Sequence, residues 1–289
     1  MKEGTQMKEL SQENLTAVIR PRPQNAHKGT FGRSVLIGGN EQYGGAIMMS
    51  AEACVKAGCG LTSVITAEKN HAALHARLPE AMVLDWRLTQ DFTGLLRTAD
   101  VILIGPGLGL EPHSQQILEQ VLLQQKSSQW LVIDGSAITL FAQKHYSLNY
   151  PKQVVFTPHQ MEWQRLSGLE IVDQTVENNQ ICQKSLGATI VLKSHRTEIY
   201  ASHSQYRNPL GTPAMATGGM GDSLAGIITG FLAQFANKEA ALCAAVYLHS
   251  LIGEELGKEH YVVLPTEISK NLPQYMKRFE QSNNKAEDK

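Results

Sequence analysis

The chain has 289 residues, of which 42% are hydrophobic, 18% charged and 6% aromatic, a composition typical of soluble globular domains. Its 26 lysines and arginines nearly balance its 27 aspartates and glutamates, so no basic surplus favours binding to nucleic acid or to an anionic membrane. The longest nearly apolar stretch, 224–236, is shorter than the roughly 20 residues that a spanning helix needs. We therefore expect neither a nucleic-acid partner nor a membrane partner.

Residues 1–10 carry charged side chains and lack the apolar segment of a secretory signal, so we expect a cytoplasmic location. The four cysteines, Cys54, Cys59, Cys182 and Cys243, have no C-x-x-C spacing and lie in apolar patterns. Such thiols are usually reduced and buried. We therefore expect neither disulfides nor a cysteine metal site.

Short apolar runs alternate with helical patterns along most of the chain. Runs rich in Val, Ile and Leu predict strands at 34–37, 61–66, 81–84, 101–104, 130–133, 154–156, 189–192 and 197–201. Helices are predicted at 45–57, 114–124, 161–166, 172–186, 221–235 and 238–256. This alternation predicts an α/β fold with a mostly parallel central sheet and helices on both faces. Small residues recur along 224–245, so we expect the last two helices to pack tightly together.

No linker, repeat or low-complexity block interrupts residues 25–275. We therefore expect residues 1–289 to form a single domain with a core at about 15–275. The polar ends, 1–10 and 281–289, are expected to fray.

In an open parallel sheet, ligands bind beyond the carboxyl ends of the strands. Small and polar residues follow four of the predicted strands, at 38–40, 105–109, 134–136 and 157–159. We therefore expect a ligand crevice at this edge of the sheet.

A glycine-rich turn, Ala-Thr-Gly-Gly-Met-Gly-Asp at 216–222, leads into an apolar helix. Glycine lets the backbone approach a ligand, and the free N–H groups at a helix start attract phosphate oxygens. The sequence thus predicts an anion hole at Gly218, Gly219, Met220 and Gly221, beside which Asp222 would accept a proton from a hydroxyl. The alternative is that Asp222 only caps the helix.

Several weaker features have two interpretations each. Gly107 and Gly109 form either a backbone shelf against a substrate or a plain turn, because 105–109 departs from the dinucleotide pattern G-x-G-x-x-G. His159 either faces the crevice or is a structural histidine. His71 and His75 are spaced like a zinc pair but lack its glutamate, so we interpret them as surface helix residues.

The segment Lys-Ser-His-Arg-Thr at 193–197 joins two predicted strands and carries two cations. It suits a nucleotide phosphate or ribose, and the alternative is an ordinary solvated hairpin turn. No Walker A loop is present in the sequence.

Taken together, the ordered motifs resemble those of the ADP-dependent NAD(P)H-hydrate dehydratases, a family with the ribokinase-like fold. The resemblance covers about residues 15–275. Its motifs are His-Lys-Gly and Phe-Gly-Arg within 27–33, Gly-Gly-Ala at 44–46, Gly-Pro-Gly-Leu-Gly at 105–109, Asp-Gly at 134–135, Thr-Pro-His at 157–159, and Gly-Gly-Met-Gly-Asp at 218–222.

The resemblance implies repair of the S epimer of hydrated NADH or NADPH (NADHX or NADPHX). ADP or ATP would phosphorylate the ring hydroxyl, the ring nitrogen would drive out the phosphate, and AMP or ADP would be released. It also implies Mg²⁺ on the nucleotide phosphates without dedicated protein ligands, and a homo-oligomer, a tetramer by family likeness. The epimerase domain fused to many relatives has no room here, so a separate epimerase is expected in the same pathway.

The resemblance also assigns roles to individual residues. Asp222 would be the catalytic base, and the amides of 219–221 would hold the transferring phosphoryl group. The hydrate's pocket would be lined by Ala46, Gly107, Gly109, His159 and Asp222. The adenine nucleotide would contact Lys193, Ser194, His195, Arg196, Thr197 and Gly221.

The chain departs from the family pattern at a few places. Met220 and Ser223 replace the more usual Thr and Val, and Gly-Thr-Pro-Ala-Met at 211–215 replaces Gly-Asn-Pro-Gly-Met. Gln160 and Met161 replace a Pro-Gly pair.

Two other functions also fit the glycine-rich turn. One is a kinase of the same fold acting on a small sugar or vitamin precursor, which would release a stable phosphorylated product. The other is a nucleotide-sensing module, which adenine nucleotide would stabilise without being consumed.

Overall fold

A single ten-stranded sheet runs through the part of the chain that the computed structural model describes, residues 7–87 and 89–287. Its strand order is β1-β10-β9-β8-β7-β6-β5-β2-β3-β4. The strands are β1 (Lys8–Glu9), β2 (Arg33–Ile37), β3 (Leu61–Thr66), β4 (Met82–Asp85), β5 (Val101–Ile104), β6 (Trp130–Ile133), β7 (Val154–Phe156), β8 (Thr189–Leu192), β9 (Glu198–Tyr200) and β10 (Gln205–Arg207).

Helices connect most of the strands. The α-helices are α1 (Gln12–Thr16), α2 (Gly44–Lys56), α3 (His71–Arg77), α4 (Thr89–Thr98), α5 (Pro112–Gln124), α6 (Ser136–Lys144), α7 (Gln160–Ser167), α8 (Val176–Leu186), α9 (Met220–Gln234), α10 (Lys238–Gly257) and α11 (Pro265–Glu287). The short 3₁₀ helices are η1 (Lys28–Phe31), η2 (Glu68–Asn70), η3 (Pro151–Gln153), η4 (Ile171–Asp173) and η5 (Pro213–Met215). Among the described residues, no helix has the length and apolar character needed to cross a bilayer.

The sheet is mostly parallel, as the sequence predicts. From β8 through β7, β6, β5, β2 and β3 to β4, each strand pairs in parallel with the next. Only β9 runs against its neighbours β8 and β10 within the described sheet. The carboxyl ends of seven neighbouring strands therefore meet at one edge.

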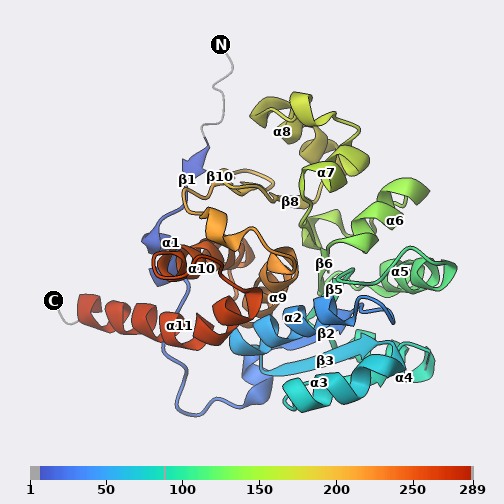
Figure 1. The fold of residues 1–289 in the computed structure, drawn as a ribbon, viewed down its shortest axis with the longest axis horizontal. Coiled ribbons are helices and arrows are strands. Elements are labelled where there is room, and N and C mark those ends of the chain that lie inside the picture. Colours follow the sequence, from blue (N-terminus) through green and yellow to red (C-terminus); the bar gives the residue numbers. More distant parts are fainter. Residues whose placement is uncertain (1–6, 88, 288–289) are drawn as a thin grey trace.

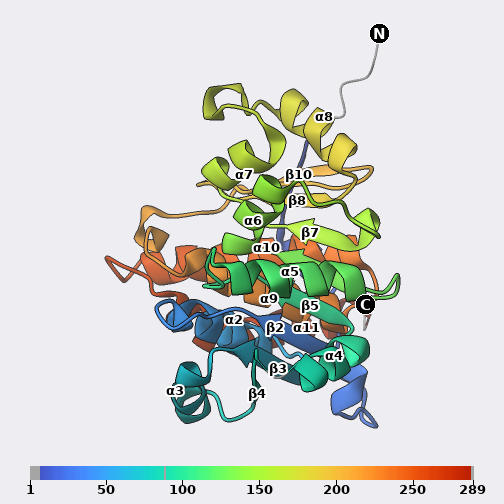
Figure 2. The same cartoon turned by 90° about the vertical axis from the view of Figure 1, so that its right-hand side faces the viewer.

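Alternate residues of each central strand enter two separate hydrophobic cores. In β5, Val101 and Leu103 belong to one core, and Ile102 and Ile104 belong to the other. Helices α1, α2, α3, α9, α10 and α11 cover the first core, and α4 to α8 cover the second (Figures 1 and 2). Burial on both faces explains why these strands are continuous apolar runs in the sequence.

The small residues of α9 allow close approach to α2. A Cβ atom on Gly226 would lie 2.1 Å from the carbonyl oxygen of Ser50, and one on Gly230 would lie 2.9 Å from that of Cys54. The expected packing between α9 and α10 is also present. These two glycines, however, face α2.

Some sequence predictions about the ends and one helix were wrong. Lys8 and Glu9 do not fray, because they pair in parallel with Tyr206 and Arg207. At the other end, α11 continues to Glu287; residues 1–6, 288 and 289 lie outside the described residues. The predicted helix at 172–186 is divided into η4 and α8, because the Thr175 side chain caps a new helix start.

Candidate active site

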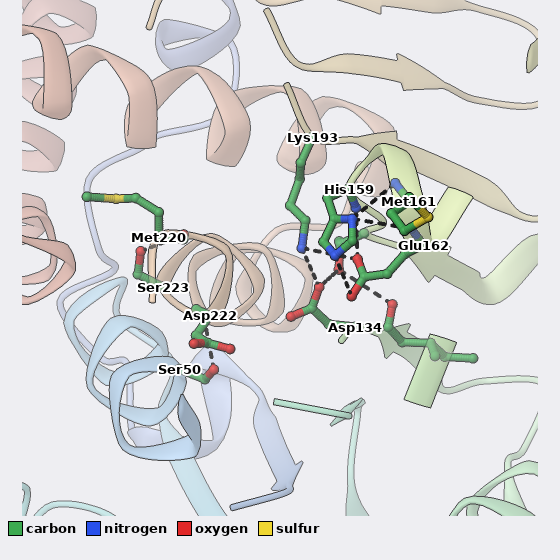
Figure 3. A network of polar contacts seen from close by, with 11 residues as sticks. Ser50, Asp134, His159, Met161, Glu162, Lys193, Met220, Asp222 and Ser223 are labelled. Carbon is green, nitrogen blue, oxygen red and sulfur yellow. Dashed lines mark hydrogen bonds and ion pairs between the residues drawn. The ribbon is translucent and has the colours of Figure 1, made fainter. Parts of the chain in front are cut away.

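A buried group of charged side chains lies at the carboxyl ends of β6, β7 and β8. Asp134 directly follows β6 and Lys193 directly follows β8. The Lys193 Nζ lies 2.8 Å from Asp134 Oδ1 and 4.0 Å from Glu162 Oε2. Thr157, which follows β7, donates a hydrogen bond to Asp134 Oδ1 at 2.6 Å. We refer to Asp134, Glu162 and Lys193 as the charged cluster (Figure 3).

The charged cluster is largely withdrawn from water. The side chains of Asp134, Glu162 and Lys193 are 3%, 8% and 18% exposed. Burial alone would lower the pKa of Lys193, but the negative charges of Asp134 and Glu162 outweigh it and raise that pKa. The ammonium therefore stays protonated, since buried charges persist only when they are paired.

His159 begins α7 through a reciprocal cap. Its Nδ1 accepts hydrogen bonds from the backbone N–H groups of Met161 and Glu162, each at 3.2 Å. In return, the His159 N–H donates to Glu162 Oε2 at 2.8 Å. The interpretation of His159 as a structural histidine is thus confirmed. Gln160 and Met161 form the first turn of α7. Contact between His159 and a substrate stays a prediction.

The glycine-rich turn sets where α9 begins. Gly219 is the N-cap residue, with φ of +92°, a conformation that other L-residues rarely adopt. A Cβ atom there would also lie 2.4 Å from the Met49 sulfur. The interpretation of Asp222 as the N-cap is therefore wrong, because Asp222 is the third residue of the helix.

The first turn of α9 lies beside the charged cluster. The N–H groups of a helix's first turn have no acceptor within the helix and carry the positive end of its dipole. A Cβ atom on Gly221 would lie only 3.0 Å from Lys193 Nζ, so the ammonium lies directly beside this turn. Figure 3 shows Lys193 reaching into the space between Asp134 and α9.

Asp222 lies in the same turn, and its backbone is held by α2. The Ser50 hydroxyl donates to the Asp222 carbonyl oxygen at 2.9 Å. Burial and the negative charge of Asp134 raise the pKa of Asp222 to about 6, against the opposing effect of Lys193. A carboxylate with this pKa is ionised at neutral pH and is a stronger base than an ordinary aspartate.

A buried histidine on α10 contacts the first turns of α9 through Ser223. His249, on α10, is 5% exposed, and its Nε2 lies 3.2 Å from Ser223 Oγ. Ser223 in turn donates to the Met220 carbonyl oxygen at 3.0 Å. Burial lowers the pKa of His249 to about 4, so its ring is neutral at physiological pH.

A cavity of about 570 Å³ opens beside the turn, within the size range of small-molecule sites. The 193–197 segment, which is the hairpin turn between β8 and β9, lines one side of it. The hairpin interpretation of this segment is thus confirmed, and its contact with a nucleotide stays a prediction. Its other lining residues come mainly from 210–216, from the first turns of α9 and from α10; they are Leu210, Gly211, Thr212, Pro213, Met215, Ala216, Met220, Gly221, Leu224, His249 and Ser250.

Three residues that we assign to the hydrate's pocket lie beyond the carboxyl ends of β2 and β5: Ala46 in the first turn of α2, and Gly107 and Gly109 after β5. Gly107 has φ of +62°, and a Cβ atom there would lie 3.1 Å from the Ala46 Cβ. Gly109 has φ of +87°, and its Cβ atom would lie 2.7 Å from Asn40 Nδ2. The turn alone thus requires both glycines, and their contact with a substrate stays a prediction.

Glu162 and His249 were not predicted from the sequence. A local signal existed for Glu162, since a cap three residues before a glutamate is a helix-start pattern. For His249, the signal was one histidine within an otherwise apolar helix. Within the described residues, no group of three or more His, Cys, Asp or Glu side chains is placed to hold a metal ion.

The sequence model of the NAD(P)H-hydrate dehydratase family matches residues 34–274. The chain is 60% identical over 275 residues to an ADP-dependent (S)-NAD(P)H-hydrate dehydratase of Enterococcus faecalis, covering 95% of this chain and 94% of the relative. This chain belongs to the NAD(P)H-hydrate dehydratase family. The resemblance inferred from the ordered motifs is confirmed.

Solved structures confirm the ribokinase-like fold of this dehydratase family member. A ribokinase-like superfamily protein of Enterococcus faecalis superposes with a TM-score of 0.94 at 60% identity, covering 95% of this chain and 97% of that one. An ADP/ATP-dependent NAD(P)H-hydrate dehydratase of Bacillus subtilis, co-crystallised with ATP and Mg²⁺, gives 0.84 at 28% identity, covering 96% and 100%.

Proposed function

We propose that this dehydratase family member uses ADP or ATP to phosphorylate the ring hydroxyl of the S epimer of NADHX or NADPHX, and then expels phosphate to give NADH or NADPH. The observation that carries this proposal is the position of Asp222. It is a partly buried carboxylate of raised pKa, in the same helix turn as the predicted anion hole. Family membership supports lyase activity, because relatives as much as 60% identical are named ADP-dependent (S)-NAD(P)H-hydrate dehydratase.

Asp222 accepts the proton of the ring hydroxyl as the hydroxyl oxygen attacks the terminal phosphorus of the nucleotide. The bond from that phosphorus to the bridging oxygen breaks, and AMP or ADP leaves. The ring nitrogen's lone pair then breaks the carbon–oxygen bond, and phosphate carries away the oxygen of the original hydrate. The neighbouring ring carbon loses a proton to water, which restores the ring double bond of NADH or NADPH. Phosphorylation thus replaces hydroxide by a much better leaving group.

Two groups stabilise the negative charge of the transferring phosphoryl group. The N–H groups of Gly219, Met220 and Gly221 supply fixed dipoles at the helix start. Lys193 supplies a full positive charge, and the charged cluster holds its ammonium beside Gly221. The cavity lined by 193–197 takes the rest of the nucleotide.

Mg²⁺ fits this site as an ion held mainly by nucleotide phosphates and water. Mg²⁺ commonly uses one or two protein carboxylates beside substrate phosphates. Asp134, whose negative charge raises the pKa of Asp222, would hold it, so that Asp222 stays free to accept the proton. When bound, the ion neutralises charge on the phosphates.

We further propose that the chain is a single domain, that it assembles as a homo-tetramer, and that it acts in the cytoplasm beside a separate epimerase. These proposals come from the family likeness and from the uninterrupted sequence of 25–275. Light scattering of the purified protein tests the assembly, and a monomer would contradict it.

The direct test is incubation of the purified protein with (S)-NADHX, Mg²⁺ and either ADP or ATP. We expect recovery of the near-ultraviolet absorbance of reduced nicotinamide, with one phosphate released per nicotinamide restored. No recovery with either nucleotide would reject the proposal. A stable phosphorylated product without free phosphate would indicate a kinase, and nucleotide binding without consumption would indicate a sensing module.

A further inference from the structure

The C-terminal end of α2 brings two cysteines together. The helix ends at Lys56, and Gly58 follows with φ of +98°. The Cys59 N–H donates to the Cys54 carbonyl oxygen at 3.3 Å, and the Gly58 N–H donates to that of Val55 at 2.9 Å. These two hydrogen bonds define a Schellman motif, in which the side chains at the positions of Cys54 and Cys59 commonly contact each other.

One hydroxyl on β2 contacts both thiols. Ser34 Oγ lies 3.3 Å from Cys54 Sγ and 3.3 Å from Cys59 Sγ. The neighbouring Cys54 lowers the pKa of Cys59 to about 6, and Cys59 together with burial raises the pKa of Cys54. The two sulfurs thus converge, and the thiolate forms preferentially at Cys59.

The surroundings distinguish an attacking thiol from a resolving thiol. Cys54 is fully buried, whereas Cys59 is partly exposed, so our expectation of burial was wrong for Cys59, as it was for Cys182. The Arg22 Nη2 donates to the Gly58 carbonyl oxygen at 2.6 Å, and its guanidinium carbon lies 3.7 Å from the Phe31 ring centroid. These contacts fix a positive charge near Cys59, and positive charge favours a thiolate.

The other two cysteines, Cys182 and Cys243, have neither a second thiol close by nor a lowered pKa. Cys182, on α8, is partly exposed, and burial raises the pKa of its thiol. Cys243, on α10, is buried, and burial raises its pKa to about 12. Within the described part of the chain, neither of these two thiols contacts a second sulfur. Cys182 is therefore a matched control, partly exposed but unpaired with another cysteine.

We propose that Cys54 and Cys59 form a redox modification site at which a hydroperoxide oxidises the two thiols to an intramolecular disulfide. The Cys59 thiolate attacks one peroxide oxygen and breaks the oxygen–oxygen bond, giving a sulfenic acid and, after protonation of the leaving oxygen, water or an alcohol. The Cys54 sulfur then attacks the sulfenic sulfur. Its proton leaves with the departing hydroxide as water.

The net reaction removes two electrons and two protons from the thiols and reduces the peroxide. The Schellman motif already holds both residues at the same helix end. The site is independent of the proposed dehydratase chemistry, because Asp222 and the nucleotide cavity take no part in it.

The test is oxidation of the folded, full-length protein with a small molar excess of hydrogen peroxide. Free thiols are then alkylated, and proteolysis with mass spectrometry follows. We expect a Cys54–Cys59 linkage with the loss of two hydrogen atoms, alkylation of Cys182 and Cys243, and reversal by dithiothreitol. Retention of all four thiols, or oxidation of Cys182 ahead of the pair, would overturn the proposal.

Two variants and an unfolded control test the roles of the individual thiols in the same experiment. Cys54→Ser removes the resolving thiol, so we expect a Cys59 sulfenic acid that dimedone traps, whereas Cys182→Ser should oxidise like the unaltered protein. Wild-type protein unfolded in urea is a further control that does not depend on a folded variant. If the unfolded chain links Cys54 to Cys59 as fast as the folded one, the fold does not prepare the site and the proposal fails.

Discussion

The molecule holds a cation between two carboxylates at two places near the strand ends, and their environments differ. In the charged cluster, the lysine side chain is only 18% exposed. At the end of β4, the Arg87 Nη2 lies 2.7 Å from Asp85 and 2.5 Å from Glu68, but Arg87 is 59% and Glu68 73% exposed. We call Arg87, Asp85 and Glu68 the surface cluster.

Burial, rather than the number of charged partners, decides what each group can do. Exposed ion pairs contribute about 0–1 kcal/mol because water and salt screen them. Removing one partner from a buried pair costs about 3–5 kcal/mol, because an unpaired charge stays behind. The charged cluster also acts on a fourth side chain, since Asp134 raises the pKa of Asp222. Of the two clusters, only the charged cluster can therefore support chemistry at the start of α9.

The largest expected effect comes from Asp222→Asn. Removing the base should lower turnover on the order of 10²- to 10⁴-fold, while nucleotide affinity by calorimetry stays nearly unchanged. Asp85→Asn in the surface cluster is the matched control and should leave turnover intact. Equal losses of affinity and turnover in Asp222→Asn would instead mark Asp222 as a structural residue.

Lys193→Met should be the most destabilising single change in this comparison. It leaves Asp134 and Glu162 buried without their cation, so we expect the free energy of unfolding to fall by about 3–5 kcal/mol. Urea titration measures this loss, and calorimetry should show weaker ADP binding. Unchanged stability would mean that water already screens the charged cluster.

His249→Asn tests the support behind the turn through its pH dependence. The pKa of His249 falls from its ordinary 6.5 to about 4 on folding. Between pH 6.5 and about pH 4, His249 is therefore protonated in the unfolded chain but neutral in the folded protein. The wild-type protein loses stability as the pH falls through this range. The stability difference between wild type and His249→Asn should thus shrink by about 2–3 kcal/mol over this range.

Thermal unfolding at several pH values checks this expectation. The exposed His75 on α3 provides the control, because His75→Ala should show no comparable pH dependence relative to wild type. A constant difference between wild type and His249→Asn across the range would contradict a buried neutral His249.

The smallest effect is expected for Arg87→Met in the surface cluster. We expect less than about 1 kcal/mol of stability to be lost, and the loss should shrink as salt is added. Urea titrations at low and high ionic strength measure both. A loss as large as that of Lys193→Met would erase the distinction between the two clusters.

The sequence predicts the central strands well for a physical reason. Both faces of the sheet are covered, so β5, β6 and β7 are unbroken apolar runs bounded by polar or small residues, and their predicted limits match the structure. By contrast, α11 is polar and contains Pro273, which conceals its helical pattern. The strand β10 has the sequence Gln-Tyr-Arg, so unlike β7 it forms no apolar run.

The residues of the candidate site also differ in how well the sequence predicts them. The glycine-rich turn and Asp222 are adjacent in the sequence, so local pattern was enough to predict them. Asp134 and Lys193 are 59 residues apart, and only the order of the strands brings them together. His249 required knowing which side of α10 faces α9, which an apolar helix does not reveal.

The most direct test of the proposed mechanism is the pH dependence of phosphoryl transfer in a single turnover, with nucleotide and hydrate both saturating. With Asp222 as the base, the rate should rise with pH through about 6, where half of the carboxylate is ionised, and level off above it as ionisation becomes complete. The residual rate of Asp222→Asn should show no inflection there. A wild-type rate that is level through this range, or an inflection that persists in Asp222→Asn, would contradict the account.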